Sequence, residues 1–217
     1  MQIRLASDMS LDSIVDGPGL RITVWAQGCA HDCKGCHNTQ THDFNGGMLV
    51  NVQEIADKII KYKLKSGVTF SGGDPMYQPK EFTELAKLLK EHNINIWCYT
   101  GFRFEKLNEE QRELLKYIDV LVDGKFNKKL FSYDLMYRGS SNQRIIDINK
   151  TLKTNSVVLL DDYGGFIRWL WRGRIYEQNE TKNKKYNKWY IISSSRDIIT
   201  WFFVYMGSIK NIYIGGD

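Results

Sequence analysis

The sequence contains little proline, no long apolar run and no block of basic residues. Only 3 of its 217 residues are proline, which excludes a proline-rich linker. The most apolar window, at residues 198–206, is far shorter than the roughly 18–20 residues that a membrane span needs. Lysine and arginine are spread along the chain at a net charge of +5, so composition alone does not call for nucleic-acid binding.

The chain has the composition of a folded domain. Hydrophobic residues make up 42% and charged residues 25%, which argues against a disordered chain. Residues 1–19 carry charges early and lack the apolar run of a secretory signal, so we expect a cytoplasmic protein. In a reducing compartment, grouped cysteines favour metal or redox chemistry over disulfides.

Strands alternate with helices along the first 160 residues. Apolar patterns predict strands over 20–27, 68–70, 94–99, 118–122 and 157–160, and helices over 51–64, 79–92 and 107–117. This alternation is typical of βα units and predicts an α/β fold with a mostly parallel sheet. Loops that follow parallel strands meet at one sheet edge, where ligands gather. We therefore expect the loops after the first four strands to converge.

The pattern stops after Asp162. Four of the 6 tryptophans lie beyond this point, and a stretch rich in lysine and asparagine, at 179–190, separates the aromatic segments. The rhythm of strands and helices does not continue here. We therefore predict two parts, a domain at residues 1–162 and an aromatic-rich C-terminal extension at 163–217 to which we assign no function.

Three of the four cysteines, Cys29, Cys33 and Cys36, lie within eight residues of one loop. Three thiolates can each bind a different iron of a four-iron cluster, which leaves one iron open to a small molecule. A structural zinc site needs a fourth ligand, and His31 or His37 could supply it. Spacing alone leaves both interpretations open. The fourth cysteine, Cys98, lies in the middle of a predicted strand and is expected to be a buried apolar residue.

The motifs around these cysteines resemble the radical S-adenosylmethionine (SAM) superfamily. More narrowly, they are similar to the activating proteins of anaerobic ribonucleoside-triphosphate reductase. The stretches that carry the resemblance are DGPGLR at 16–21, GCAHDCKGCHN at 28–38, FNGG at 44–47, SGGDPM at 71–76, YTGF at 99–102, VLVDGKF at 120–126 and RGSSNQRIID at 138–147. They occur in the family's order, and the last two distinguish this activase from other superfamily members.

The resemblance implies a partial (β/α) barrel and a defined chemistry. Cys29, Cys33 and Cys36 would hold a 4Fe–4S cluster whose open iron binds SAM. One electron would cleave SAM to methionine and a 5′-deoxyadenosyl radical. That radical would take a hydrogen from a glycine of the reductase and leave a glycyl radical. The cofactor supplies the difficult chemistry, and the protein orients it.

The resemblance also implies the residues that contact SAM. The backbone of Gly72 and Gly73 would approach the ligand, since glycine has no Cβ in the way. Asp74 would add an acceptor for its ammonium group, although SGGDP is also typical of an ordinary turn. The remaining expected contacts are Gly35, Cys36 and His37, with the His37 ring near the adenine, and Thr100 and Asp123 at two further strand ends.

The reaction implies protein partners. The large subunit of the reductase must dock over SAM, and a low-potential electron donor such as flavodoxin or ferredoxin must reduce the cluster; neither a membrane nor nucleic acid is implied. One alternative is an activase of another glycyl-radical enzyme, such as pyruvate formate-lyase. A deazaguanine-forming synthase is a further alternative, and a non-catalytic zinc or iron–sulfur interaction module is a third. Colour tests the last, because an iron–sulfur protein is brown and a zinc protein is colourless.

Overall fold

The computed structural model describes residues 1–63 and 65–160, so the predicted extension at 163–217 and its boundary lie outside the described residues. The described part of the chain contains eight strands and four α-helices. The strands are β1 (Gln2–Leu5), β2 (Ser10–Ser13), β3 (Arg21–Ala26), β4 (Met48–Asn51), β5 (Gly67–Gly72), β6 (Ile96–Thr100), β7 (Val120–Asp123) and β8 (Arg144–Asp147). The helices are α1 (Val52–Lys61), α2 (Pro79–Lys90), α3 (Glu109–Leu115) and α4 (Ile148–Thr154).

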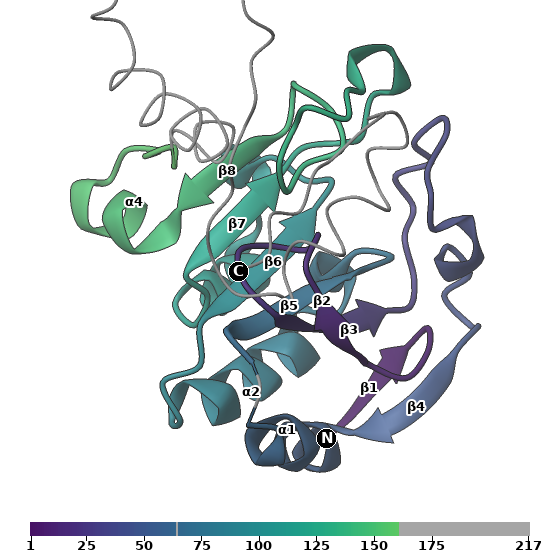
Figure 1. Cartoon of the computed structure of the whole chain (residues 1–217), viewed down its shortest axis with the longest axis vertical. Helices are drawn as coiled ribbons and strands as arrows, with labels where there is room; N and C mark the ends of the chain where they lie inside the picture. The colour runs from purple at the N-terminus through teal and green to yellow at the C-terminus, as the bar shows by residue number, and fades with distance from the viewer. Residues whose placement is uncertain (64, 161–217) are drawn as a thin grey trace, which may run out of the picture. The chain divides into compact units, whose positions relative to one another are not determined.

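The strands form one sheet in the order β4-β1-β3-β5-β6-β7-β8, with β2 paired to β3 (Figure 1). Its four central strands, β3, β5, β6 and β7, are parallel to one another. The predicted α/β fold with a parallel centre is therefore confirmed. Strands β1, β2, β4 and β8 pair antiparallel to their neighbours. The order does not return to its first strand, so the sheet is open, as a partial barrel is.

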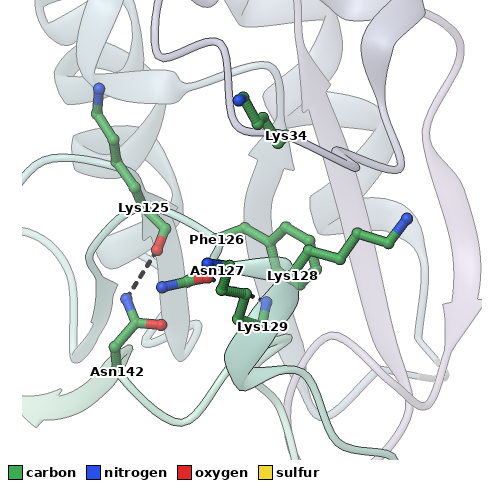
Figure 2. A pocket seen from close by; sticks show the side chains of 7 residues that line it. All are labelled: Lys34, Lys125, Phe126, Asn127, Lys128, Lys129 and Asn142. Atoms are coloured by element: carbon green, nitrogen blue, oxygen red, sulfur yellow. Dashed lines mark hydrogen bonds between the residues drawn. The ribbon is translucent and has the colours of Figure 1, made fainter.

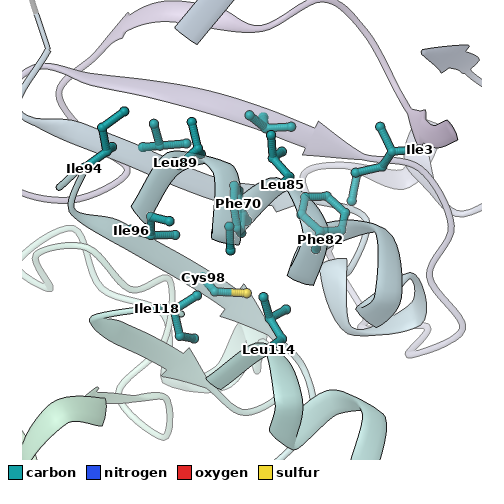
Figure 3. Close-up of a cluster of buried hydrophobic side chains, with 14 of the residues drawn as sticks. Ile3, Phe70, Phe82, Leu85, Leu89, Ile94, Ile96, Cys98, Leu114 and Ile118 are labelled. Atoms are coloured by element: carbon teal, nitrogen blue, oxygen red, sulfur yellow. The ribbon is translucent and has the colours of Figure 1, made fainter. Parts of the chain in front are cut away.

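The main core lies between the sheet and helices α1, α2 and α3 (Figure 3). Alternate residues of the central strands point toward the helices, and each helix presents one apolar face to them. Cys98 is fully buried among these side chains, which confirms its predicted place in the core. The residues at the centre of this core are Ile22, Val24, Val68, Phe70, Ile96, Cys98, Ile55, Ile59, Phe82, Leu85, Leu89 and Leu114.

Local signals explain where the helices begin. Pro79 occupies the first turn of α2, and Asn51 accepts a hydrogen bond from the Gln53 N–H to cap α1. Asn108 and Gln111 form a reciprocal capping box at α3. The three predicted helices are confirmed, although each is shorter than its apolar pattern.

One predicted strand is wrong. Residues 157–160 contribute only an isolated bridge, between Leu159 and Ile146 of β8. The sequence pattern missed β8 itself, which is only four residues long. It also missed β4, whose Met48 and Leu49 are largely exposed and show no buried face.

Gly72 ends β5 in a conformation that a side chain would disturb, and this gives a first prediction. Gly72 and Gly124 share a φ of +101°, but a Cβ on Gly72 would lie 2.7 Å from the Ala26 backbone N and O. At Gly124 the nearest atom, on Arg103, is 3.4 Å away. We expect Gly124→Ala to lower the free energy of unfolding by about 1–3 kcal/mol, through backbone strain alone. Gly72→Ala should cost about 2 kcal/mol more, because backbone must shift. Urea denaturation of both variants tests this, and equal losses would contradict it.

Candidate active site

The three clustered cysteines lie on the loop that follows β3. Both its ends are held by main-chain hydrogen bonds, from Gly28 N to Thr41 O at 2.8 Å and from Cys29 N to His42 O at 3.1 Å. All three thiols are free and half-buried. The loop is therefore held in place independently of its sulfur atoms.

Each of the three thiols accepts a backbone N–H. Asn38 N donates to Cys36 Sγ at 3.4 Å, and the N–H groups of His31 and Phe126 donate to Cys29 and Cys33. Hydrogen bonds to cysteine sulfur are among the means by which proteins tune iron–sulfur clusters. No local sequence pattern indicates the Phe126 donor, which lies 93 positions beyond Cys33.

The thiols also lie in one electrostatic neighbourhood. The pKa of Cys29 is raised to about 11, mainly by burial and also by the nearby Asp74, Cys33 and Cys36, while the hydrogen bond from His31 opposes the shift. Burial likewise raises the pKa of Cys33. A bound cation reverses this balance, because it stabilises thiolates. Within residues 1–63 and 65–160, no three His, Cys, Asp or Glu side chains are grouped to hold a single metal ion, whereas in a four-iron cluster each cysteine binds its own iron.

Asp74 joins the cysteine loop to two strand ends. Its side chain is 1% exposed. Its Oδ2 lies 2.7 Å from His31 Nε2 and accepts from Thr100 Oγ1 and Gly101 N, both at 2.9 Å. Its Oδ1 accepts from Met76 N at 2.9 Å. Both carboxylate oxygens are thus engaged within the protein, which makes Asp74 a positioning residue; the expected contact with the SAM ammonium stays a prediction.

His31 fixes the cysteine loop from the inside. Its side chain is 7% exposed. Its ring centroid lies 4.5 Å from that of Phe102 and 5.5 Å from that of Tyr77. A Cβ on Gly101 would lie 2.3 Å from the His31 ring, so only glycine fits there. Spacing presented His31 as a candidate fourth zinc ligand and carried no signal for its pairing with Asp74, which lies 43 positions further along.

Gly73 packs directly against the cysteine loop. A Cβ there would lie 2.6 Å from Gly28 O and 3.0 Å from Thr41 O. Gly73 N donates to Ala26 O at 2.8 Å, and Asn38 Nδ2 donates to Gly72 O at 3.2 Å. The backbone of Gly72 and Gly73 thus lies close to the cysteine loop. The approach of these glycines to SAM stays a prediction.

The segment after β7 lies over the other side of the loop. The His37 ring is 5.7 Å from Phe126 and 6.3 Å from Phe131, centroid to centroid. Gly35 has a φ of +79°, and a Cβ on it would lie 3.0 Å from the Lys128 side chain. These contacts and those of Asp74 confirm that four loops converge, namely the cysteine loop and the loops at Gly72–Asp74, Thr100–Gly101 and Asp123–Gly124.

Asp123 is the centre of an ion-pair network. Its carboxylate is fully buried and pairs with Arg103 at 3.2 Å and with Arg144, whose Nε donates to Oδ1 at 2.9 Å. It also accepts from Phe104 N at 2.8 Å. Arg144 in turn holds Glu105 in a bidentate pair at 2.9 Å, and this hydrogen bonding lowers the pKa of Glu105 to about 2. The expected contact of Asp123 with SAM stays a prediction.

Comparison with known proteins agrees with the site. The family described as "4Fe-4S single cluster domain" matches residues 15–146. The anaerobic ribonucleoside-triphosphate reductase-activating protein of Haemophilus influenzae is 38% identical over 140 residues, which are 61% of this chain and 90% of that protein. The proteins of the same name from Enterobacteria phage T4 and Escherichia coli are 39% and 37% identical and are covered to 86% and 90%. The chain belongs to this family of reductase-activating proteins.

The 4Fe–4S domain match at residues 15–146 contains every candidate site residue of this reductase-activating protein, from Cys29 to Asp123. A solved structure, QueE from Escherichia coli, is 16% identical with a TM-score of 0.39, over 46% of this chain and 52% of that one. None of the helices in the described residues is both long and apolar enough to span a bilayer.

Proposed function

We propose that this chain activates an anaerobic ribonucleoside-triphosphate reductase by generating a glycyl radical on it. The similarity to reductase-activating proteins over about nine-tenths of their length is the observation that carries this proposal. The geometry supports it, because three thiols that each accept an N–H lie on a loop tied to the ends of β5 and β6. Such an enzyme is a radical SAM oxidoreductase.

Cys29, Cys33 and Cys36 are the residues that we propose hold the 4Fe–4S cluster. When bound, the cluster supplies the electron that cleaves SAM into methionine and the 5′-deoxyadenosyl radical, which takes hydrogen from the reductase's glycine. The backbone N–H groups of His31, Phe126 and Asn38 stabilise negative charge on the three sulfurs. Asp74 and His31 hold the loop in register with the ends of β5 and β6.

We propose that SAM lies where the cysteine loop meets these strand ends. Gly35, Cys36 and His37 would line one side of it, and Gly72 and Gly73 another. Asp74, Thr100 and Asp123 would shape the wall between them, since their polar atoms already hold that wall together. The reductase's glycine must reach SAM directly, because a deoxyadenosyl radical reacts with whatever it meets first.

The test is anaerobic reconstitution with iron and sulfide, then reduction by dithionite with SAM. We expect a brown protein that releases 5′-deoxyadenosine, and a glycyl-radical doublet in the electron paramagnetic resonance spectrum once the cognate reductase is added. Omitting SAM is the control. Deoxyadenosine with a doublet on pyruvate formate-lyase instead would favour that substrate. A colourless protein that binds zinc and leaves SAM intact would overturn the proposal.

The proposed division of the chain gives a second prediction. Cutting after Asp162 keeps all the described residues, including the bridge of Leu159 to β8. We expect this truncated protein to fold, to hold its cluster and to release deoxyadenosine at a rate within about twofold of the full chain, since no residue of the proposed site is removed. Loss of cluster and cleavage in a soluble, folded truncation would show that residues 163–217 belong to the site.

A further inference from the structure

The cysteine loop has two electrostatically different sides. On one side Asp74 Oδ2 lies 2.7 Å from His31 Nε2, and on the other Lys125 Nζ donates to His31 O at 3.2 Å. The first side faces the strand ends at which we place SAM. The second side faces the segment that follows β7, from which the proposed function uses only the Phe126 N–H.

A cavity of about 520 Å³ lies on this second side (Figure 2). Four of the residues that line it are lysines, and none is acidic. We call these four lysines, all exposed, the lysine patch: Lys34, Lys125, Lys128 and Lys129. Within the described chain none of them forms an ion pair, in contrast to Lys80, Lys90, Lys116 and Lys150.

Unpaired like charges this close repel one another. Figure 2 shows the long side chains of Lys125 and Lys128 extending away from each other. A surface that carries several cations without ion-pair partners suits an anionic partner better than an apolar one.

The lysine patch is joined directly to the cysteine loop. Phe126, which follows Lys125 in the chain, donates its N–H to the Cys33 thiol. Lys125 Nζ donates to His31 O at 3.2 Å. The side chain of Lys128 packs on Gly35, where a Cβ would lie 3.0 Å from Lys128 Cδ. A protein seated on the patch would therefore lie next to the cysteine ligands.

We propose that the lysine patch is the docking surface for an acidic protein that donates single electrons. The proposal rests on the proposed function, since a cluster at the three cysteines must be reduced before SAM is cleaved. The donor loses one electron and the activating protein gains one, with no atom transferred. Carboxylates on the donor would pair with the lysines and speed its association.

The test compares three reconstituted full-length variants. In the first, Lys34, Lys128 and Lys129 are changed to Gln, which removes charge and keeps the side-chain stems; Lys125 is left because it bonds to His31. In the second, the same three become Arg. In the matched control, Lys58, Lys61 and Lys153 become Gln, since they lack ion pairs among the described residues and lie on α1 and α4.

The probe is flavodoxin, an acidic flavoprotein, and the readout is its Kd at about 0.05 M and about 0.5 M salt.

We expect the first variant to bind flavodoxin about tenfold more weakly at low salt, because three exposed charge pairs each contribute a few-fold. Its salt dependence should also be shallower, since salt screens exposed charges. The Arg variant and the control should bind as the unchanged protein does. Dithionite-driven release of deoxyadenosine should be equal in all four.

Two results would overturn the docking proposal. One is an unchanged flavodoxin Kd in the first variant. The other is a glycyl-radical yield under dithionite that falls in that variant, which would assign the patch to the reductase. Failure of the proposed function is distinct, because the unchanged protein would then release no deoxyadenosine with dithionite, whatever its affinity for flavodoxin.

Discussion

Replacing Cys29, Cys33 or Cys36 by Ala is expected to abolish release of 5′-deoxyadenosine and formation of the glycyl radical. Each thiolate would bind a different iron, so the loss of one leaves a cluster with two protein ligands. Iron bound after reconstitution should fall well below the roughly four atoms expected of one cluster, and the brown absorbance should fade. Iron analysis and an assay for deoxyadenosine under dithionite measure both effects.

Cys98→Ala is the matched control for these variants. Cys98 is fully buried in the core and distant in sequence from the loop. Removing its sulfur should lower the free energy of unfolding by about 1–2 kcal/mol, as the loss of one buried heavy atom does, and leave the iron content unchanged. A loop variant that kept a full cluster and full SAM cleavage would remove that cysteine from the ligand set.

Asp74→Ala is expected to cause the second largest loss. It would leave His31, Thr100 and the N–H groups of Gly101 and Met76 without their shared acceptor. Each buried group left unpaired costs about 1–3 kcal/mol, so we expect a total of about 3–5 kcal/mol after partial relaxation. The cysteine loop would also lose its tie to β5 and β6, and SAM should bind at least about 30-fold more weakly.

Asp119→Ala provides the comparison for Asp74→Ala. Asp119 precedes β7, at the opposite end of the parallel strands, and its carboxylate likewise accepts several hydrogen bonds, from Ile96 N, Lys90 Nζ and Asn149 Nδ2. We expect it to lower stability by about 2–4 kcal/mol and to leave SAM binding intact. Urea denaturation and equilibrium dialysis of SAM, at a temperature where both variants are folded, separate the two effects. If Asp74→Ala bound SAM as tightly as Asp119→Ala, a positioning role for Asp74 would be excluded.

The sequence predicts the centre of this fold better than its edges. The central strands carry unbroken apolar runs because they are buried on both faces, and the helices carry one apolar stripe. Strand β4 exposes Met48 and Leu49, and β8 begins with Arg144, whose role is to pair with Asp123. The residues at 157–160 look like a strand because they are apolar, yet they pair only through Leu159.

The candidate site, too, is only partly predictable from the sequence. The cysteine spacing is local, and the rule that loops after parallel strands converge is general, so both could be predicted. Apart from Met76, two positions from Asp74, the partners of Asp74 and Asp123 lie about 20–40 residues away in the chain, and no local pattern encodes them. The sequence showed two acidic residues at strand ends as candidate ligand contacts, and the structure shows both as buried acceptors for the protein's own donors.

The main-chain bonds that close the cysteine loop have a consequence for how the protein is loaded and repaired. Gly28 to Thr41 and Cys29 to His42 are bonded through backbone atoms, and β1 pairs with strands on both sides of the loop. We therefore expect this region to fold without metal, unlike a zinc finger, in which ion binding supplies the folding free energy. A molecule that has lost its iron to oxygen would then remain folded, and rebuilding its cluster would restore activity without synthesis of a new chain.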